Sequence, residues 1–236
     1  MKSKSNYNNA ILLVSDITKG MKSIGSKALL NLSKNITIID YQIQYLKKYY
    51  YPINIYICTG FEHEKIVKKT SKYKNIFYVY NENYETNNQA ESLIQCFKTH
   101  NLNDAIIIAN GIMLLDKIPI NARESSLVIT NRQCKTEFDI GTTDLLASKY
   151  LFYDLPNKWL EYVFLDKRSI DTILSISESK ECHKLFLFEI INLLMDHGID
   201  INPILINKNL PIKINNIKDL SIAKKYYEKY FHHKVK

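Results

Sequence analysis

Short apolar runs alternate with longer amphipathic stretches along most of the chain. Apolar runs separated by a helix length are typical of strands in a parallel sheet that is buried on both faces. We therefore expect an α/β fold of three layers (αβα) with a mixed, mainly parallel sheet. The expected strands are residues 10–15, 53–58, 75–80, 105–109 and 126–130, with shorter strands at 140–143, 203–206 and 212–214.

Apolar residues spaced three and four apart predict helices between these runs. In the first predicted helix, Ile39, Ile43 and Leu46 share one face. A later helix is expected to end at Gly198, because glycine readily adopts the left-handed conformation that closes many helices. The expected helices are residues 38–50, 62–70, 89–100, 185–197 and 217–231.

The length of 236 residues fits one domain with a sizeable core, preceded by a polar tail over residues 1–9. No apolar run reaches the length of a membrane span, and the tail lacks the apolar segment of a secretion signal. We therefore expect a cytoplasmic protein. The four cysteines form no CxxC pair, so we expect reduced core residues rather than disulfides or a zinc site.

The formal net charge is +8, from 32 basic and 24 acidic residues. A basic protein attracts anions such as nucleic acids, anionic membranes and phosphorylated metabolites. No nucleic-acid-binding motif accompanies this charge, so we do not favour a nucleic-acid partner. Most of the excess is expected on solvated helix faces, such as Lys65, Lys68, Lys69, Lys72, Lys74, Lys224, Lys225 and Lys229.

A lysine-rich polar loop follows the first predicted strand and contains Lys19, Gly20, Lys22 and Lys27. A loop in this position lies at the carboxyl edge of the sheet, where α/β proteins bind ligands. Backbone N–H groups and lysine side chains there can hold a triphosphate. The same loop and its strand, AILLVS followed by DITKGMKSIGSKALL, resemble the opening of the nucleotidyltransferase superfamily that makes nucleotide sugars and CDP-alcohols.

This resemblance covers residues 10–116 well and residues 212–227 moderately. It implies a Rossmann-like fold of the nucleotide-diphospho-sugar transferase type over 1–236, with a variable, helical acceptor-side region at about 144–200. It also implies catalytic roles for Lys27, Lys22 and Asp16. The implied nucleotide-binding residues of the first strand and loop are Val14, Ser15, Lys19 and Gly20.

The segment YNENYETNNQAESL is similar to a segment of phosphocholine cytidylyltransferases that lies beside the nucleotide. The resemblance implies nucleotide contacts by Asn87, Asn88 and Ser92, and by Asn110 after the fourth strand. Asparagine can both donate and accept hydrogen bonds to a base or ribose. Ser92 lies one helical turn from Asn88. We also expect Thr86 or Asn87 to cap this helix.

Two positions depart from the family pattern. The family carries a metal-binding Asp after the fourth strand, where this chain has Ile112, and a late Glu-Ile-Asp-Thr segment, where it has Lys213-Ile214-Asn215-Asn216. The resemblance implies Mg²⁺, but Ile112 offers no ligand and Asn215 offers only a neutral carbonyl. The remaining candidate acids are Asp104, Asp116, Asp219 and Asp16, and Asp116 lies beyond the expected end of the strand.

Three functions remain open at this point. The first is transfer of a nucleotidyl group, CMP before others, from an NTP such as CTP to a phosphorylated sugar or alcohol for surface glycan synthesis. The second is a pseudoenzyme that binds a nucleotide or a protein partner with little or no turnover, as the replaced metal acids suggest. The third is a glycosyltransferase with a related fold, although no acidic DxD-like pair follows the fourth strand. The sequence does not indicate the oligomeric state.

Overall fold

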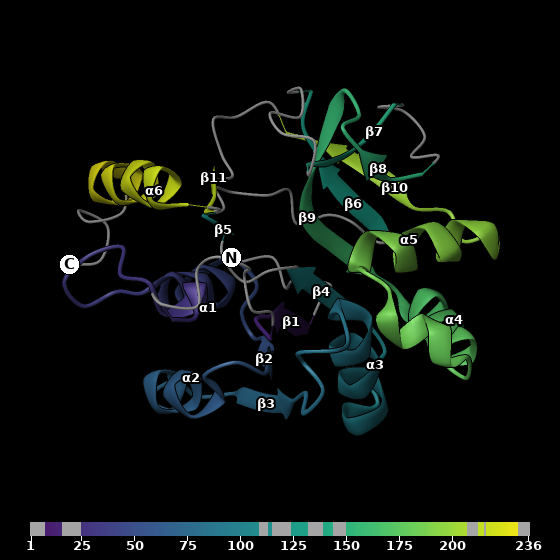
Figure 1. Cartoon of the computed structure of the whole chain (residues 1–236), viewed down its shortest axis with the longest axis horizontal. Helices are drawn as coiled ribbons and strands as arrows, with labels where there is room; N and C mark the ends of the chain where they lie inside the picture. The colour runs from purple at the N-terminus through teal and green to yellow at the C-terminus, as the bar shows by residue number, and fades with distance from the viewer. Residues whose placement is uncertain are drawn as a thin grey trace.

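The computed structural model describes residues 8–15, 25–108, 113–114, 124–131, 139–143, 150–206, 212–214 and 216–230. Its main sheet has the strand order β10–β6–β9–β4–β1–β2–β3, with β7 and β8 attached beside β9 (Figure 1). A small second sheet pairs β11 with β5. The strands are β1 (Asn9–Leu13), β2 (Asn54–Thr59), β3 (Ile76–Tyr80), β4 (Ala105–Ile108), β5 (Met113–Leu114), β6 (Ser126–Ile129), β7 (Ile140–Thr142), β8 (Phe152–Tyr153), β9 (Asn157–Leu165), β10 (Asn202–Leu205) and β11 (Ile212–Lys213).

Parallel pairing dominates the main sheet. Strand β1 lies between β4 and β2 and runs parallel to both, β3 is parallel to β2, and β10 is parallel to β6. Strand β9 is antiparallel to both β4 and β6 and joins the two parallel parts. The expected mixed, mainly parallel sheet is confirmed.

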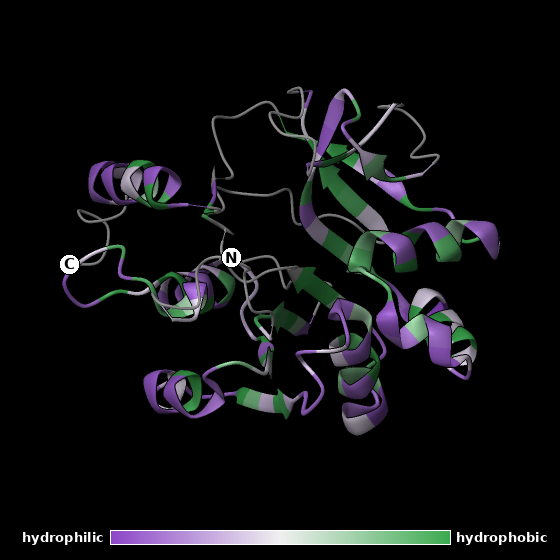
Figure 2. Cartoon of the chain, in the orientation of Figure 1, coloured by the Kyte–Doolittle hydropathy of each residue, from purple (hydrophilic) through white to green (hydrophobic). Residues whose placement is uncertain are grey.

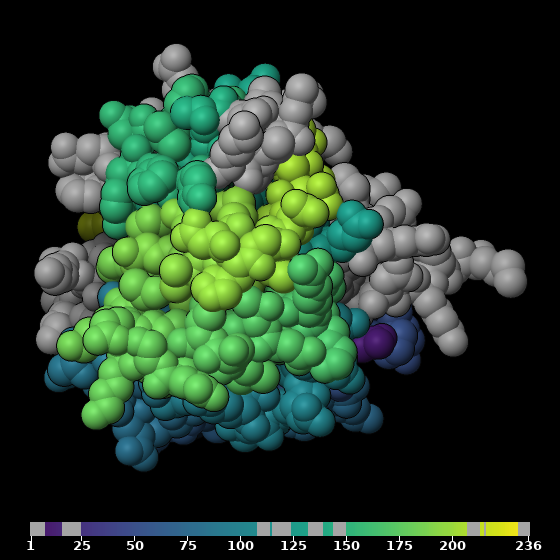
Figure 3. All heavy atoms as spheres, turned by 90° about the vertical axis from the view of Figure 1, so that its right-hand side faces the viewer, coloured from purple at the N-terminus to yellow at the C-terminus, as the bar shows by residue number. Residues whose placement is uncertain are grey.

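Helices cover both faces of the sheet (Figure 1). One face carries α3 (Gln89–His100), α4 (Lys167–Ile176) and α5 (Leu187–Asp196), and in Figure 3 α4 and α5 form a continuous surface above the segment that contains α3. The opposite side carries α1 (Ile38–Tyr49), α2 (His63–Thr70) and α6 (Ile217–Tyr230). Two short 3-10 helices, η2 (Lys27–Leu29) and η3 (Lys180–Lys184), complete the elements.

The alternation of side chains along the strands builds two cores. In β1, Ala10 and Leu12 join the core under α1, whereas Ile11 and Leu13 join the core under α3. A strand directs successive side chains to opposite faces, so an apolar strand covered on both sides supplies both cores. Strand β4, whose residues are all apolar, is accordingly coloured as hydrophobic in Figure 2.

All the strands and helices expected from the sequence are present, with ends shifted by a residue or two. Gly198 has φ +72° directly after the helix that it was expected to close, which confirms its capping role. The region 144–200 differs from expectation, because its described part is not only helical. It contains β8 and β9, and β9 is a central strand of the sheet.

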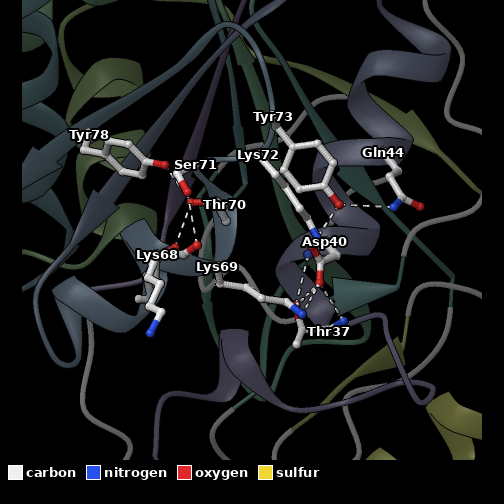
Figure 4. Close-up of polar contacts among 11 residues, drawn as sticks. Thr37, Asp40, Gln44, Lys68, Lys69, Thr70, Ser71, Lys72, Tyr73 and Tyr78 are labelled. Atoms are coloured by element: carbon white, nitrogen blue, oxygen red, sulfur yellow. Dashed lines mark hydrogen bonds and ion pairs between the residues drawn. The ribbon is translucent and has the colours of Figure 1, made fainter.

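The lysines near α2 are not all simply solvated, as the charge pattern had suggested. Lys69 and Lys72 contact the carboxylate of Asp40, whose side chain is fully buried at the start of α1, with N–O distances of 3.1 and 2.9 Å (Figure 4). Thr37 and Tyr73 donate hydroxyl hydrogen bonds of 2.7 and 2.8 Å to the same carboxylate. Burial alone would raise the pKa of Asp40, but these donors hold it at about 2. The cluster ties α1 to the end of α2.

Candidate functional site

Four parallel strands end at one edge of the sheet. Because β4, β1, β2 and β3 are adjacent and parallel, the segments that follow them leave at the same carboxyl edge. Ser15 follows β1, Gly60 follows β2, and Asn81 follows β3. Ligands of α/β proteins bind outside this edge. The lysine-rich loop after β1 and the segment after β4 therefore start side by side, as the sequence predicts.

Ser15 and Ser92 meet directly beneath this edge. Their hydroxyl oxygens lie 3.0 Å apart, and the side-chain amide of Asn81 donates to the Ser92 oxygen, also at 3.0 Å. All three side chains are buried. The predicted contact residue Ser92 thus joins the ends of β1 and β3 to α3, and a role in positioning Ser15 fits its geometry better than direct contact with a ligand.

The turn between β2 and α2 holds both ends of the lysine-rich loop. The Phe61 N–H donates to the Ser15 carbonyl at 3.3 Å, and the Ser26 N–H donates to the Glu62 carboxylate at 2.7 Å. Gly60 allows this approach, because a Cβ there would lie 2.8 Å from the Ser15 carbonyl oxygen. Contacts from Lys65 and from the Ser26 N–H lower the pKa of Glu62, which therefore stays ionised.

The described ends of the loop include two predicted site residues besides Ser15. Val14 is buried, and its N–H donates to the Cys58 carbonyl at 3.0 Å. Lys27 begins η2 just after the anchored Ser26 and is partly exposed. The other predicted loop residues lie outside the described residues: Asp16, Lys19, Gly20 and Lys22.

The start of α3 differs from one expectation. The N-cap residue is Asn88 rather than Thr86 or Asn87, and no side-chain hydrogen bond caps this helix. Thr86 donates instead to the Asn83 carbonyl at 3.2 Å, and the Asn88 side-chain amide donates to the Lys184 carbonyl in η3. Asn87 and Asn88 are both partly exposed beside the carboxyl edge. The prediction that they contact a nucleotide remains a prediction.

An ion pair that the sequence did not predict lies at the same edge. Ile108, the last residue of β4, pairs with Tyr162, so Glu161 is the next residue of β9 beyond the end of β4. The Lys213 ammonium of β11 donates to the Glu161 carboxylate. Only 7% of Glu161 is exposed, and its φ of +53° is in the left-handed region although it lies inside a strand. An irregularity in the pairing of β9 with β6 accompanies this backbone.

A second ion pair lies close to the first. Lys158 of β9 contacts the buried carboxylate of Asp139. Burial lowers the pKa of the Lys213 ammonium, but the charge and hydrogen bond of Glu161, with smaller contributions from Asp139 and Tyr153, outweigh burial and raise that pKa. Lys213 is therefore a partly buried, charged ammonium at the carboxyl edge.

The fold pairs described residues that flank the two departures from the family pattern. Met113 pairs with Lys213. In the sequence, Met113 directly follows Ile112, and Lys213 lies two residues before Asn215. Ile112 and Asn215 themselves lie outside the described residues, as do Asn110 and Asp116. The pairing of β5 with β11 is the reason that segments about a hundred residues apart in the chain share one edge.

The described residues do not fit a divalent cation at this edge. The resemblance puts a metal-binding acid at Asn215, and Lys213, two residues before it, directs its ammonium to Glu161. Within the described ranges, no three His, Cys, Asp or Glu side chains gather as a metal site would need. A signal for Glu161 was present in the sequence, since it is a single charge inside the apolar run WLEYVFL.

The fold is that of nucleotidyltransferases. The chain is similar to CTP:phosphocholine cytidylyltransferase from Streptococcus pneumoniae, with a TM-score of 0.73 and 19% identity over 93% of this chain and 99% of the other. It is also similar to the inositol-1-phosphate CTP transferase from T. maritima, with a TM-score of 0.72 and 13% identity over 95% and 98% of the two chains.

A nucleoside-diphosphate-sugar pyrophosphorylase from Vibrio cholerae superposes with a TM-score of 0.72 and 10% identity, over 91% of this chain and 99% of that one. No protein-family model matches the sequence, and no curated protein does. At these identities the likeness establishes the fold. In the parts of the chain that are described, no helix has the length and apolar character needed to cross a membrane.

Proposed function

We propose that this chain binds a nucleoside triphosphate, with CTP the first candidate, at the carboxyl edge of β1 to β4. It then transfers the nucleotidyl group, CMP in that case, to a phosphorylated sugar or alcohol, in a step of surface glycan synthesis. The observation that carries this proposal is the double anchoring of the lysine-rich loop. The turn between β2 and α2 holds both Ser15 and Ser26, the two described ends of the loop, at the carboxyl edge of the sheet, where α/β proteins bind ligands.

The proposed reaction is an in-line displacement at phosphorus. An oxygen of the acceptor phosphate forms a bond to the α-phosphorus of the triphosphate, and the bond from that phosphorus to the oxygen bridging to the β-phosphate breaks. Pyrophosphate leaves with the electron pair. Most of the catalysis in such a step comes from positioning and from neutralising negative charge.

Residues of this chain could supply both requirements. We assign charge neutralisation to the loop lysines Lys22 and Lys27, and contacts to the base or ribose to Asn87 and Asn88. Asp16 would act at the mouth of the loop. The remaining residues assigned to the nucleotide are Val14, Ser15, Lys19, Gly20, Ser92 and Asn110, with Ser92 acting through Ser15.

A second function has its own support. The resemblance puts metal-binding acids at Ile112 and Asn215, and the nearby Lys213 ammonium is paired with Glu161. The loss of these acids favours a protein that binds a nucleotide or a protein partner with little or no turnover. Binding and turnover therefore need separate measurements.

The binding test is a thermal-shift screen of the wild-type chain with CTP, UTP, GTP, ATP and dTTP. A ligand that binds only the folded state raises the apparent unfolding temperature. We expect CTP to give the largest shift. If no nucleotide raises the unfolding temperature and calorimetry also detects no binding, the transferase and the nucleotide-binding form of the second function are both rejected.

The turnover test measures pyrophosphate release from CTP mixed with phosphocholine or with a sugar 1-phosphate. Release that needs both substrates and is lost in Lys27→Ala supports the transferase. Nucleotide binding without release supports the second function. Lys34→Ala is the matched control, because Lys34 is exposed on the chain that follows η2.

A further inference from the structure

We infer that the Lys213 ammonium, held by Glu161, takes the place of a divalent cation at the carboxyl edge, so that this chain excludes a metal there and binds its nucleotide without one. The exclusion of the metal is argued from the ion pair of Lys213 with Glu161 alone. The statement about the nucleotide rests on the proposed function.

The backbone at Glu161 is the first observation. A residue with a side chain seldom adopts φ +53°, and residues held in such conformations cluster at functional sites. Here the left-handed residue interrupts β9 just beyond its pairing with the last residue of β4. This geometry places the Glu161 carboxylate within reach of β11, where it accepts the hydrogen bond from Lys213.

The position of Lys213 is the second observation. It lies on a strand of two residues whose partner β5 follows directly on the segment after β4. Its side chain is 20% exposed and that of Glu161 is 9% exposed. The Glu161 carboxylate is buried and would be disfavoured without a partner, so the partly exposed Lys213 ammonium holds it in its ionised form.

The balance of charge is the third observation. Among the described residues at this edge, Glu161 is matched by Lys213 and Asp139 is matched by Lys158. A divalent cation bound to the Glu161 carboxylate would lie a few ångströms from the Lys213 ammonium. Like charges at that separation, in a partly buried place, repel strongly. The ammonium therefore competes with a metal for the same carboxylate.

Lys213→Glu removes the ammonium and sets a second carboxylate opposite Glu161. Two facing carboxylates are a favourable arrangement for a hard cation and an unfavourable one without it. The variant should thus acquire a cation site that the wild-type chain lacks, and that site should depend on Glu161.

The first experiment measures Mn²⁺ binding by electron paramagnetic resonance, without nucleotide. We expect the wild-type chain to bind no tighter than about 1 mM, the weak end for carboxylate sites. Lys213→Glu should bind at least tenfold tighter, and the double variant with Glu161→Gln should lose that gain. Lys167→Glu is the matched control, because it makes the same charge change at an exposed pair with Asp171. It should behave as the wild type.

Two results would overturn the exclusion of the metal. One is wild-type Mn²⁺ binding as tight as that of Lys213→Glu. The other is a Lys213→Glu site that survives Glu161→Gln. Circular dichroism and the unfolding temperature check that each variant is folded. If Lys213→Glu does not fold, Lys213→Met, which only deletes the ammonium, should still bind Mn²⁺ at least threefold tighter than the wild type, and no gain would count against the inference.

The second experiment needs no variant. Calorimetry compares CTP binding to the wild-type chain in EDTA and in excess MgCl₂. We expect dissociation constants within a factor of two, and a value more than tenfold tighter with Mg²⁺ would overturn the inference. If CTP and the other nucleotides do not bind in either buffer, the proposed function fails, while the Mn²⁺ measurement still decides whether the ammonium excludes the metal.

Discussion

The hydroxyl oxygens of Ser15 and Ser92 lie 3.0 Å apart, buried below the carboxyl edge of the sheet. The resemblance assigned both residues to a nucleotide site, and both side chains are buried in this structure. Their contact fixes the end of β1, from which the lysine-rich loop begins, against α3. Asn81 completes the arrangement by donating to the Ser92 oxygen.

Ser92→Ala should lower the free energy of unfolding by about 1–3 kcal/mol, because it leaves the buried amide of Asn81 and the buried hydroxyl of Ser15 without this partner. Urea unfolding measures the change. Ser71→Ala is the control, since Ser71 donates one hydrogen bond at an exposed position. We expect a change below about 0.5 kcal/mol there. Equal effects of the two substitutions would contradict the central role of Ser92.

Lys27→Ala should weaken nucleotide binding by about 1–3 kcal/mol, the range for a lost charge-assisted hydrogen bond. Lys27 begins η2 immediately after the anchored Ser26. Isothermal titration calorimetry with the nucleotide chosen by the thermal-shift screen gives the affinities. Unchanged affinity in Lys27→Ala, with Lys34→Ala as reference, would remove Lys27 from the proposed site.

The Asp40 cluster should make the fold sensitive to acid. The folded-state pKa of about 2 lies below the unfolded value near 3.8, so the stabilisation is present above about pH 4 and is lost as the pH falls through 2. The full difference corresponds to about 2 kcal/mol. The gap in unfolding free energy between the wild type and Asp40→Asn should therefore narrow by about 2 kcal/mol between pH 5 and pH 2.

The control for this effect is Asp171→Asn, which removes an exposed carboxylate paired with Lys167. The difference in unfolding free energy between Asp171→Asn and the wild type should change little over the same pH range, because exposed ion pairs contribute little to stability. A gap for Asp40→Asn that stays constant with pH would show that Asp40 is not held ionised by its lysines and hydroxyl donors.

The backbone at Glu161 gives a test that is independent of its charge. Glu161→Ala and Glu161→Gly both remove the ion pair, but only glycine adopts φ +53° without steric cost. We expect Glu161→Gly to be more stable than Glu161→Ala by about 0.5–1 kcal/mol in urea unfolding, despite the greater freedom of glycine in the unfolded chain. A Glu161→Ala variant more stable than Glu161→Gly would argue against a left-handed backbone at position 161 of β9.

Restoring the acids of the family pattern should restore metal binding only in part. Ile112→Asp with Asn215→Asp adds two carboxylates near Met113 and Lys213. We expect tighter Mg²⁺ binding in the nucleotide complex than in the wild type, and a further gain when Lys213→Glu is added, because the repelling ammonium is then gone. Calorimetric Mg²⁺ titrations measure both steps. Rapid, Mg²⁺-dependent pyrophosphate release by the wild-type chain would contradict the reasoning behind these substitutions.

The sequence by itself determined most of the layered architecture. Apolar runs such as residues 10–15 and 53–58 could be recognised because parallel strands buried on both faces are apolar throughout. Helical spacing located α1 and α3, and Gly198 marked the end of α5. The sequence also predicted that the lysine-rich loop begins at the carboxyl edge, because the loop directly follows the first strand along the chain.

Only the tertiary structure decided the place of β9 and of the ion pair on it. Its sequence, NKWLEYVFL, contains a charge in the middle and lacks the uniform apolar pattern of its neighbours, so no periodicity distinguishes it as a central strand. The contact of Glu161 with Lys213 joins residues 52 positions apart, one on β9 of the main sheet and the other on β11 of the small second sheet. Long-range pairing of this kind leaves no local pattern, and that is why the charge of Glu161 could be seen in the sequence while its partner could not.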